Sequence, residues 1–240
     1  MSIQTIVHRP LAVTFGLVVA GASLAACGAQ AHQPTVSAGS GTTTTSGQES
    51  TRTTLECSYT PVNDLMGTKN PGLPPQPAPG PTKATFTTSA GTFVITLNAA
   101  KAPCTTSSFR HLVEVGFFNK THCARLTTTG IYVLQCGDPT GTGAGGPGYT
   151  IPDENLVGAT YPAGTVAMAN TGAPHSGGSQ FFIVYKNGSA LQPDYTPFGT
   201  VTSGLSVIKR VAAGGAPNTN PAGGGLPKIP VNISTVKMSS

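Results

Sequence analysis

From about residue 82 to the C-terminus, short apolar stretches alternate with clusters of turn-forming residues. Residues 85–87 and 93–97 are rich in β-forming residues and flank Ser89-Ala90-Gly91, which is typical of a β-hairpin. Short runs of this kind predict a mainly β domain in which each strand is only a few residues long. The further runs are residues 131–134, 165–168, 181–185, 198–201 and 231–236.

Two segments place apolar residues at helical spacing instead. Residues 104–115 follow Pro103 and predict a helix that Thr105 or Thr106 caps at its start. Residues 204–213 predict a second helix, with its apolar side chains on one face. Many short strands with two isolated helices favour an antiparallel barrel or sandwich that the helices cap.

The N-terminus has the order of a secretory signal. His8 and Arg9 precede an apolar run over residues 11–24, and small residues follow. This run is shorter than the roughly 20 residues that a membrane-spanning helix needs. Residues 24–27 (LAAC) resemble the lipobox of bacterial lipoproteins, which implies removal of residues 1–26 and lipidation of Cys27. We therefore expect an exported chain, lipid-anchored at the outer face of the cell membrane. The alternative is a plain secretory signal with an incidental cysteine.

A tether is expected between the lipid acceptor and the domain. Residues 28–52 are mostly Ser, Thr, Gly and Gln and cannot bury enough apolar surface to offset their ordering entropy. Residues 70–81 are rich in proline, which predicts a stiff, extended spacer. Between them, Cys57 is expected to fasten its segment to the surface of the domain. The organisation is thus a signal peptide (1–26), a flexible tether (27–81) and a folded domain (82–240).

Composition and charge exclude several classes of function. Only 9% of residues are charged, and the net charge of +5 is scattered without a Lys/Arg run, so nucleic-acid binding is not expected. Besides Cys27 the chain has Cys57, Cys104, Cys123 and Cys136, and an even number in an exported protein predicts two disulfides. Three pairings are possible. No C-x-x-C pair occurs, so neither a metal nor another cofactor is expected.

One glycine-rich match has no chemical meaning of its own. Residues 141–146 satisfy the G-x-G-x-x-G pattern of dinucleotide sites. Such a site needs a helix that starts at once, so that its N-terminus meets the pyrophosphate. Pro147 and Gly148 follow instead and cannot open that helix. We interpret these glycines as a loop.

Four blocks stand out in the predicted domain: residues 134–143 (LQCGDPTGTG), 163–170 (AGTVAMAN), 178–183 (GSQFFI) and 198–201 (FGTV). In sequence, order and spacing they resemble the cyclophilin-type peptidyl-prolyl cis-trans isomerases. The resemblance implies an eight-stranded antiparallel barrel capped by two helices, with the active groove on its outer face. On that fold Cys123 and Cys136 would lie on neighbouring strands, which favours Cys123–Cys136 and Cys57–Cys104 among the three pairings.

The resemblance also implies roles for single residues. The family's catalytic arginine falls on Arg125 and its glutamine on Gln135, although the usual Phe-His-Arg is changed to Cys-Ala-Arg and about two extra residues follow it. The groove tryptophan falls on Ala190, which implies weak inhibition by cyclosporin. The remaining groove positions are Tyr132, Val133, Ala169, Asn170, Gln180, Phe182, Leu191 and Tyr195.

Two hypotheses of function follow. The first is a monomeric, cofactor-free isomerase that accelerates rotation about Xaa–Pro bonds while exported, proline-containing polypeptides fold. The second is a cyclophilin-fold module that binds proline peptides with little or no turnover, a reading kept open by the changed residues before Arg125 and by Ala190. Arg125 and Gln135 favour the first, since binding alone has less need of the arginine. A tethered structural or adhesion domain has no motif in its support.

Overall fold

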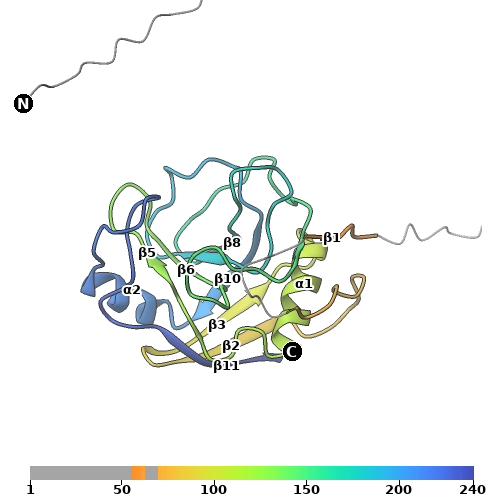
Figure 1. Cartoon of the computed structure of the whole chain (residues 1–240), viewed down its shortest axis with the longest axis horizontal. Coiled ribbons are helices and arrows are strands. Elements are labelled where there is room, and N and C mark those ends of the chain that lie inside the picture. The colour runs from red at the N-terminus through yellow and green to blue at the C-terminus, as the bar shows by residue number, and fades with distance from the viewer. Residues whose placement is uncertain (1–55, 63–69) are drawn as a thin grey trace, which may run out of the picture. The chain divides into compact units, whose positions relative to one another are not determined.

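The computed structural model of the chain describes residues 56–62 and 70–240. The predicted signal peptide and the lipid acceptor Cys27 lie outside these residues. The described chain forms a curled antiparallel sheet with two helices (Figure 1), which confirms the fold class expected from the sequence. None of the described helices is long and apolar enough to span a bilayer.

The main sheet has nine strands in the order β4-β11-β2-β3-β10-β8-β9-β6-β5, against the eight expected. The extra count arises where the sheet closes, because β4 ends at His122 and β5 begins at Arg125. One stretch of chain therefore pairs with β11 at one edge and with β6 at the other. The strands are β2 (Lys83–Thr88), β3 (Gly91–Leu97), β4 (Thr121–His122), β5 (Arg125–Leu126), β6 (Val133–Cys136), β8 (Thr165–Met168), β9 (Phe181–Val184), β10 (Pro197–Ser203) and β11 (Asn232–Ser239).

Aromatic side chains fill the inside of the curled sheet. Phe181 of β9 is fully buried, and its ring centroid lies 5.6 Å from that of Phe109, 5.8 Å from that of Phe86 and 5.8 Å from that of Phe118. These rings come from segments far apart in the sequence, so their packing holds the sheet and the first helix together. Tilted and edge-on contacts of this kind add to the free energy of burial.

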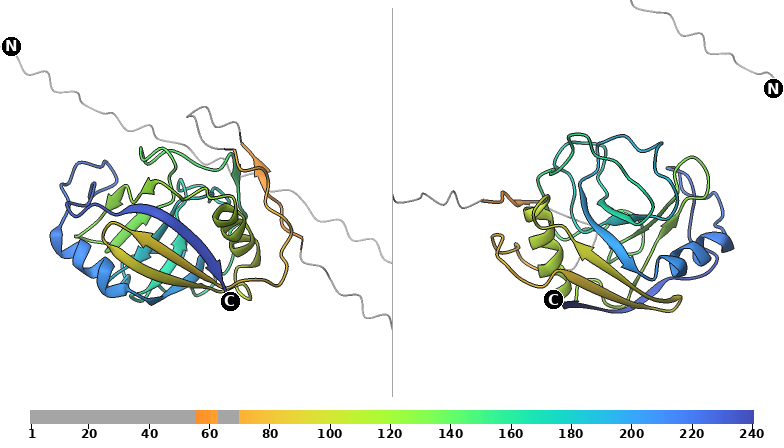
Figure 2. Two further views of the ribbon diagram at one scale, coloured as in Figure 1. Left: turned by 90° about the horizontal axis from the view of Figure 1, so that it is seen from below. Right: turned by 180° about the vertical axis from the view of Figure 1, so that it is seen from behind.

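The two helices lie on opposite sides of the curled sheet (Figure 2). They are α1 (Pro103–Glu114) and α2 (Leu205–Gly214). The predicted cap of α1 by Thr105 or Thr106 is wrong, because the helix already begins at Pro103. Its free N–H groups are capped by a distant carboxylate instead: Glu154 accepts from the backbone nitrogens of Cys104 (2.9 Å) and Thr105 (2.8 Å).

Residues 56–62, named the strap below, lie along the domain. The structure contains the disulfides Cys57–Cys104 and Cys123–Cys136, and the first of them fastens the strap to α1. A short strand of the strap, β1 (Thr60–Pro61), pairs with β7 (Tyr149–Thr150) in a separate two-stranded sheet. The proline-rich run also contacts α1, since Ser107 Oγ donates to the carbonyl oxygen of Pro75 (2.9 Å). These contacts make both described segments part of the folded unit.

Replacement of Phe181 by alanine should strongly destabilise the fold. The cavity would open among four other aromatic rings that strands and a helix hold in place, so the core can collapse only partly around it. We expect Phe181→Ala to lower the free energy of unfolding by about 4 kcal/mol in denaturant titrations. Val157→Ala is the control, because Val157 is fully exposed and its change should stay within about 0.5 kcal/mol. Equal effects of the two variants would contradict this account of the core.

Candidate active site

The site begins where the barrel closes, at the pairing of β5 with β6. Arg125 lies directly opposite Gln135, and its Nη1 donates to Gln135 Oε1 (3.1 Å). Gln135 Nε2 donates in turn to Gln180 Oε1 (2.8 Å). Gln180 Nε2 donates to the carbonyl oxygens of Gly143 (3.0 Å) and Gly145 (2.9 Å). A continuous polar chain therefore links the arginine to the glycine-rich loop, and each side-chain amide is oriented by its neighbours.

Arg125 is also held from its other side by backbone carbonyls. Its Nε donates to the carbonyl oxygen of Gly223 (2.8 Å) and its Nη2 to that of Ala222. Burial lowers the pKa of the guanidinium, but arginine stays cationic in proteins. These contacts use three of its five N–H groups. Arg125 lines a cavity, so its other N–H groups can donate to a bound molecule.

The loop that supplies these carbonyls is tightly built; we name residues 217–225 the cradle. Its end pairs with β5, since Leu126 N donates to Gly225 O (2.7 Å) and Gly225 N donates back (3.1 Å). Asn218 Oδ1 accepts from the backbone nitrogen of Gly224 (2.8 Å). Gly224 has φ of +72°, and any Cβ there would meet the carbonyl oxygen of Leu126, so only glycine fits. The cradle therefore fixes the direction of the guanidinium.

Beside Arg125 lies a cavity of about 390 Å³ with an apolar wall. Phe182 of β9 is 4% exposed and meets Tyr195 edge-on, with ring centroids 5.2 Å apart. Val133 of β6 packs in the same small cluster, and Leu191 and Ile131 pack against it. A cationic donor at the rim of an aromatic and aliphatic hollow suits a peptide that carries a small apolar ring.

Tyr132 lies outside this cavity, contrary to its expected place in the proline pocket. Its ring packs edge-on with Tyr185 at 6.0 Å, and Lys186 Nζ lies 4.5 Å from its centre. Residues 131, 133 and 135 line the cavity instead, because successive side chains along an extended segment point to opposite faces. Ile131 therefore takes the place expected for Tyr132. The extra residues after Arg125 shift this position relative to the family pattern, which is why a match by sequence assigns Tyr132 to the pocket.

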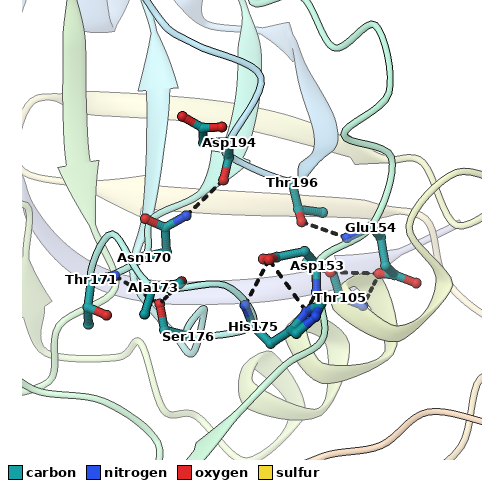
Figure 3. Close-up of polar contacts among 10 residues, drawn as sticks. All are labelled: Thr105, Asp153, Glu154, Asn170, Thr171, Ala173, His175, Ser176, Asp194 and Thr196. Atoms are coloured by element: carbon teal, nitrogen blue, oxygen red, sulfur yellow. Dashed lines mark hydrogen bonds and ion pairs between the residues drawn. The ribbon is translucent and has the colours of Figure 1, made fainter. Parts of the chain in front are cut away.

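Ala169 and Asn170 also line the cavity. Asn170 Nδ2 donates to the carbonyl oxygen of Asp194 (2.8 Å), as Figure 3 shows. Its Oδ1 accepts from Gly172 N (3.1 Å). The side chain is therefore engaged in holding its own loop. Within the described residues, no hydrogen bond is formed by the backbone N–H or carbonyl of Asn170. That backbone is available to an extended peptide in the groove.

A buried carboxylate fixes the glycine-rich loop on the third side. Asp138 accepts from the backbone nitrogens of Thr140 (2.7 Å) and Gly143 (2.5 Å). Burial opposes ionisation of Asp138, but the hydrogen bonds outweigh burial and hold its pKa below the usual range. The carboxylate is therefore charged at neutral pH, and residues 141–143 keep their place at the cavity rim.

The structure thus brings together nine of the ten sequence-predicted site residues, with Gln180 in an adjoining cavity that shares Gln135. Sequence reasoning missed Ile131 and the cradle residues Asn220, Ala222 and Gly223. No motif indicates the cradle, because its part in the site is played by backbone carbonyls in an ordinary Gly/Pro loop. Ala190 is exposed beside Leu191 and does not line the cavity.

The fold and groove define an antiparallel β-barrel protein with an apolar cavity beside a fixed arginine. Residues 83–238 match the family model "Cyclophilin type peptidyl-prolyl cis-trans isomerase/CLD". The chain is 40% identical over 212 residues to the probable peptidyl-prolyl cis-trans isomerase B of Mycobacterium leprae, covering 80% of this chain and 69% of that protein. It is 38% identical over 200 residues to that of Mycobacterium tuberculosis, covering 75% of this chain and 63% of the relative.

Solved structures agree with this result. A cyclophilin-type peptidyl-prolyl cis-trans isomerase of Cryptosporidium parvum has a TM-score of 0.58 and 25% identity, covering 67% of this chain and 99% of that one. A second structure of it, in the presence of the dipeptide Ala-Pro, has a TM-score of 0.57, 25% identity and coverages of 66% and 99%. The chain belongs to the cyclophilin-type peptidyl-prolyl cis-trans isomerase family, which confirms the enzyme class expected from its sequence blocks.

Asn218 does not line the cavity, but loss of its side chain should change the orientation of Arg125. We expect Asn218→Ala to lower kcat/KM about tenfold, mainly through kcat, because one hydrogen bond that holds the cradle is lost. Asn218→Asp keeps an oxygen acceptor for Gly224 N and should restore most of the activity. Peptide isomerisation rates measure both effects.

Two controls separate positioning from general damage. Asn70 Oδ1 likewise accepts from a backbone nitrogen, that of Gly72 (3.0 Å), in an exposed turn, so Asn70→Ala should leave the rate unchanged. In an Arg125→Ala background, Asn218→Ala should cost nothing further, because a residue that acts through Arg125 is then silent. Additive losses in the double variant would show that the cradle does not act through the arginine.

Proposed function

We propose that this chain accelerates rotation about Xaa–Pro bonds of exported polypeptides as they fold, with Arg125 as the catalytic residue and Gln135 as its partner. One observation carries the proposal: the Arg125 guanidinium is held by Gln135 and by two carbonyls at the rim of an apolar cavity. A binding module needs only the cavity, whereas a catalyst needs a fixed donor beside it.

The chemistry requires neither a nucleophile nor a metal. Rotation about an Xaa–Pro amide faces a barrier of about 18–20 kcal/mol, and no bond to carbon is made or broken. The catalyst must bind the twisted amide more tightly than either planar isomer. As resonance is lost, the prolyl nitrogen regains its lone pair and becomes a better hydrogen-bond acceptor.

The groove supplies the parts that such a step needs. Val133, Phe182 and Leu191 offer an apolar place for the proline ring. The free backbone of Asn170 holds the peptide next to it. Arg125 then donates to the prolyl nitrogen or to the rotating carbonyl oxygen, where a preoriented charged donor costs no reorganisation during the step.

Arg125→Ala tests this assignment. We expect kcat/KM of the full chain to fall about 100- to 1,000-fold in a protease-coupled proline isomerisation assay, since a preorganised charged donor is lost. Arg210→Ala is the matched control, because Arg210 also donates to a backbone carbonyl, that of Ala90, but lies on α2 away from the groove. Unchanged activity in Arg125→Ala would overturn the role of Arg125. A wild-type chain that binds proline peptides without accelerating rotation would move the function to a binding module.

The location of the enzyme is part of the proposal. The signal-like residues 1–26 and the lipobox-like segment before Cys27 support export and lipid anchoring at the outer face of the membrane. Two disulfides in the described residues also support export, because disulfides persist in oxidising compartments. We propose that the anchored chain is a monomer, and that the part of the predicted tether before the strap (27–55) lets the groove reach unfolded polypeptides near the membrane.

Cys27→Ser separates lipid anchoring from simple secretion. Serine has no thiol to take the diacylglycerol, so we expect the variant to lose labelling by a radioactive fatty acid and to shift from the membrane to the soluble fraction. Cells that express either protein are fractionated and probed for the chain. Cys57→Ser is the control, since that cysteine lies in a disulfide and not in the lipobox. Equal labelling of wild type and Cys27→Ser would contradict lipidation at this residue.

A further inference from the structure

The strap lies outside the part of the chain that matches the family model, yet it is firmly attached to the domain. Cys57 is bound to Cys104 of α1. Its backbone nitrogen donates to Gln76 Oε1 (2.6 Å), and its carbonyl accepts from Gln76 Nε2 (3.1 Å). Tyr59 OH donates to the carbonyl oxygen of Cys104 (3.0 Å). Four contacts therefore hold a stretch of a few residues in one place.

The far end of the strap reaches a second cavity beside the groove. β1 pairs with β7, and Val62 N donates to the carbonyl oxygen of Gly148 (2.9 Å). Val62 lines this cavity of about 610 Å³, together with Gln135, Ala169 and Asn170 of the groove. The groove therefore opens into the cavity that Val62 lines, and this cavity can take a residue next to an Xaa–Pro unit bound in the groove.

The described lining of the second cavity is uncharged, which disfavours charged side chains of a bound peptide. Among the described residues that line it there is no Asp, Glu, Lys, Arg or His; small residues and the glycine-rich loop make up most of this lining. A charged side chain would lose part of its hydration there without gaining an oppositely charged partner among the described residues. Val62 is apolar, yet 42% of its surface is exposed, so it has contact area to offer. An uncharged, apolar side chain is what this surface favours.

We propose that the strap is a specificity element of the isomerase. Val62 contacts the side chain of a residue next to the Xaa–Pro unit and favours uncharged, apolar residues at that position. The disulfide Cys57–Cys104 is the covalent contact that keeps Val62 at the cavity, because a two-residue β1–β7 pairing and a few hydrogen bonds hold the strap only weakly. This inference rests on the proposed isomerase function and names the sequence context that the same groove prefers.

A charge exchange tests it on the full chain with its disulfides formed. Two peptide series place Leu, Lys or Glu directly before or directly after one Xaa–Pro unit, and kcat/KM is measured for each. Wild type should favour Leu in one series. Val62→Glu should lower kcat/KM for the Leu peptide of that series about threefold and raise it for the Lys peptide about threefold, as for a partly exposed ion pair. Leu73→Glu is the matched control, because Leu73 is 52% exposed and lines neither cavity. It should leave the ratios of kcat/KM between the Leu, Lys and Glu peptides unchanged.

Release of the strap gives a second, independent reading. Cys57→Ser combined with Cys104→Ser should reduce the preference for Leu toward that of Val62→Ala, because the strap then keeps only its hydrogen bonds and holds Val62 less firmly at the cavity. The strap's role would be overturned if wild type is active and both Val62→Glu and the double serine variant keep the wild-type ratios of kcat/KM between the Leu, Lys and Glu peptides. The isomerase function would then still stand. A wild type with no isomerase activity on any peptide would instead overturn the proposed function.

Discussion

The pairing of Arg125 with Gln135 across β5 and β6 is the contact on which the site depends. It occurs at the point where the curled sheet closes, and β5 contributes only Arg125 and Leu126. A strand of two residues forms too few backbone hydrogen bonds to hold a side chain in one position. Three further constraints hold it here: Leu126 is fully buried in the core, the cradle pairs with it at Gly225, and the disulfide Cys123–Cys136 joins the segment to β6. The contacts that close the barrel therefore also orient the guanidinium of Arg125.

The alternation of side chains along β6 and β9 connects the core to the groove. Phe181 faces the inner aromatic cluster while its neighbour Phe182 forms the floor of the cavity. Likewise Leu134 is buried in the core, and Gln135 beside it holds Arg125. A shift of either strand by one residue would exchange the core and groove faces. The packing that stabilises the barrel thus also fixes which side chains can meet a peptide, and the groove needs few stabilising contacts of its own.

Much of this was predictable because it is local in the sequence. The blocks around Asn170, Gln180 and Gln135 lie on loops and strands whose residues are neighbours in the chain. The β-rich runs and helical spacing indicated an antiparallel barrel or sandwich capped by helices, and the resemblance of the blocks implied the barrel. The cradle was not predictable, since Arg125 and Gly223 are 98 residues apart and meet through a carbonyl that every residue possesses. Strands of two residues, such as β1 and β5, also carry no periodic signal. The expected place of Tyr132 was wrong for a related reason. Inserted residues shift the correspondence between this sequence and the family pattern, whereas the pleat of the strand decides which side chain faces the cavity.

The two disulfides act on different parts of this arrangement. Cys123–Cys136 closes a short loop of 13 residues and stiffens the segment that carries Arg125. Cys57–Cys104 spans 47 residues and fastens an element that lies outside the residues matching the family model. Because the entropy of loop closure grows only with the logarithm of loop length, the longer crosslink restrains the unfolded chain only slightly more than the shorter one. Its larger consequence is local: it places Val62 beside a groove that residues 83–238 build alone. Under the proposed function, Cys123–Cys136 helps to orient Arg125 and Cys57–Cys104 completes the surface around the substrate, so both depend on an oxidising compartment.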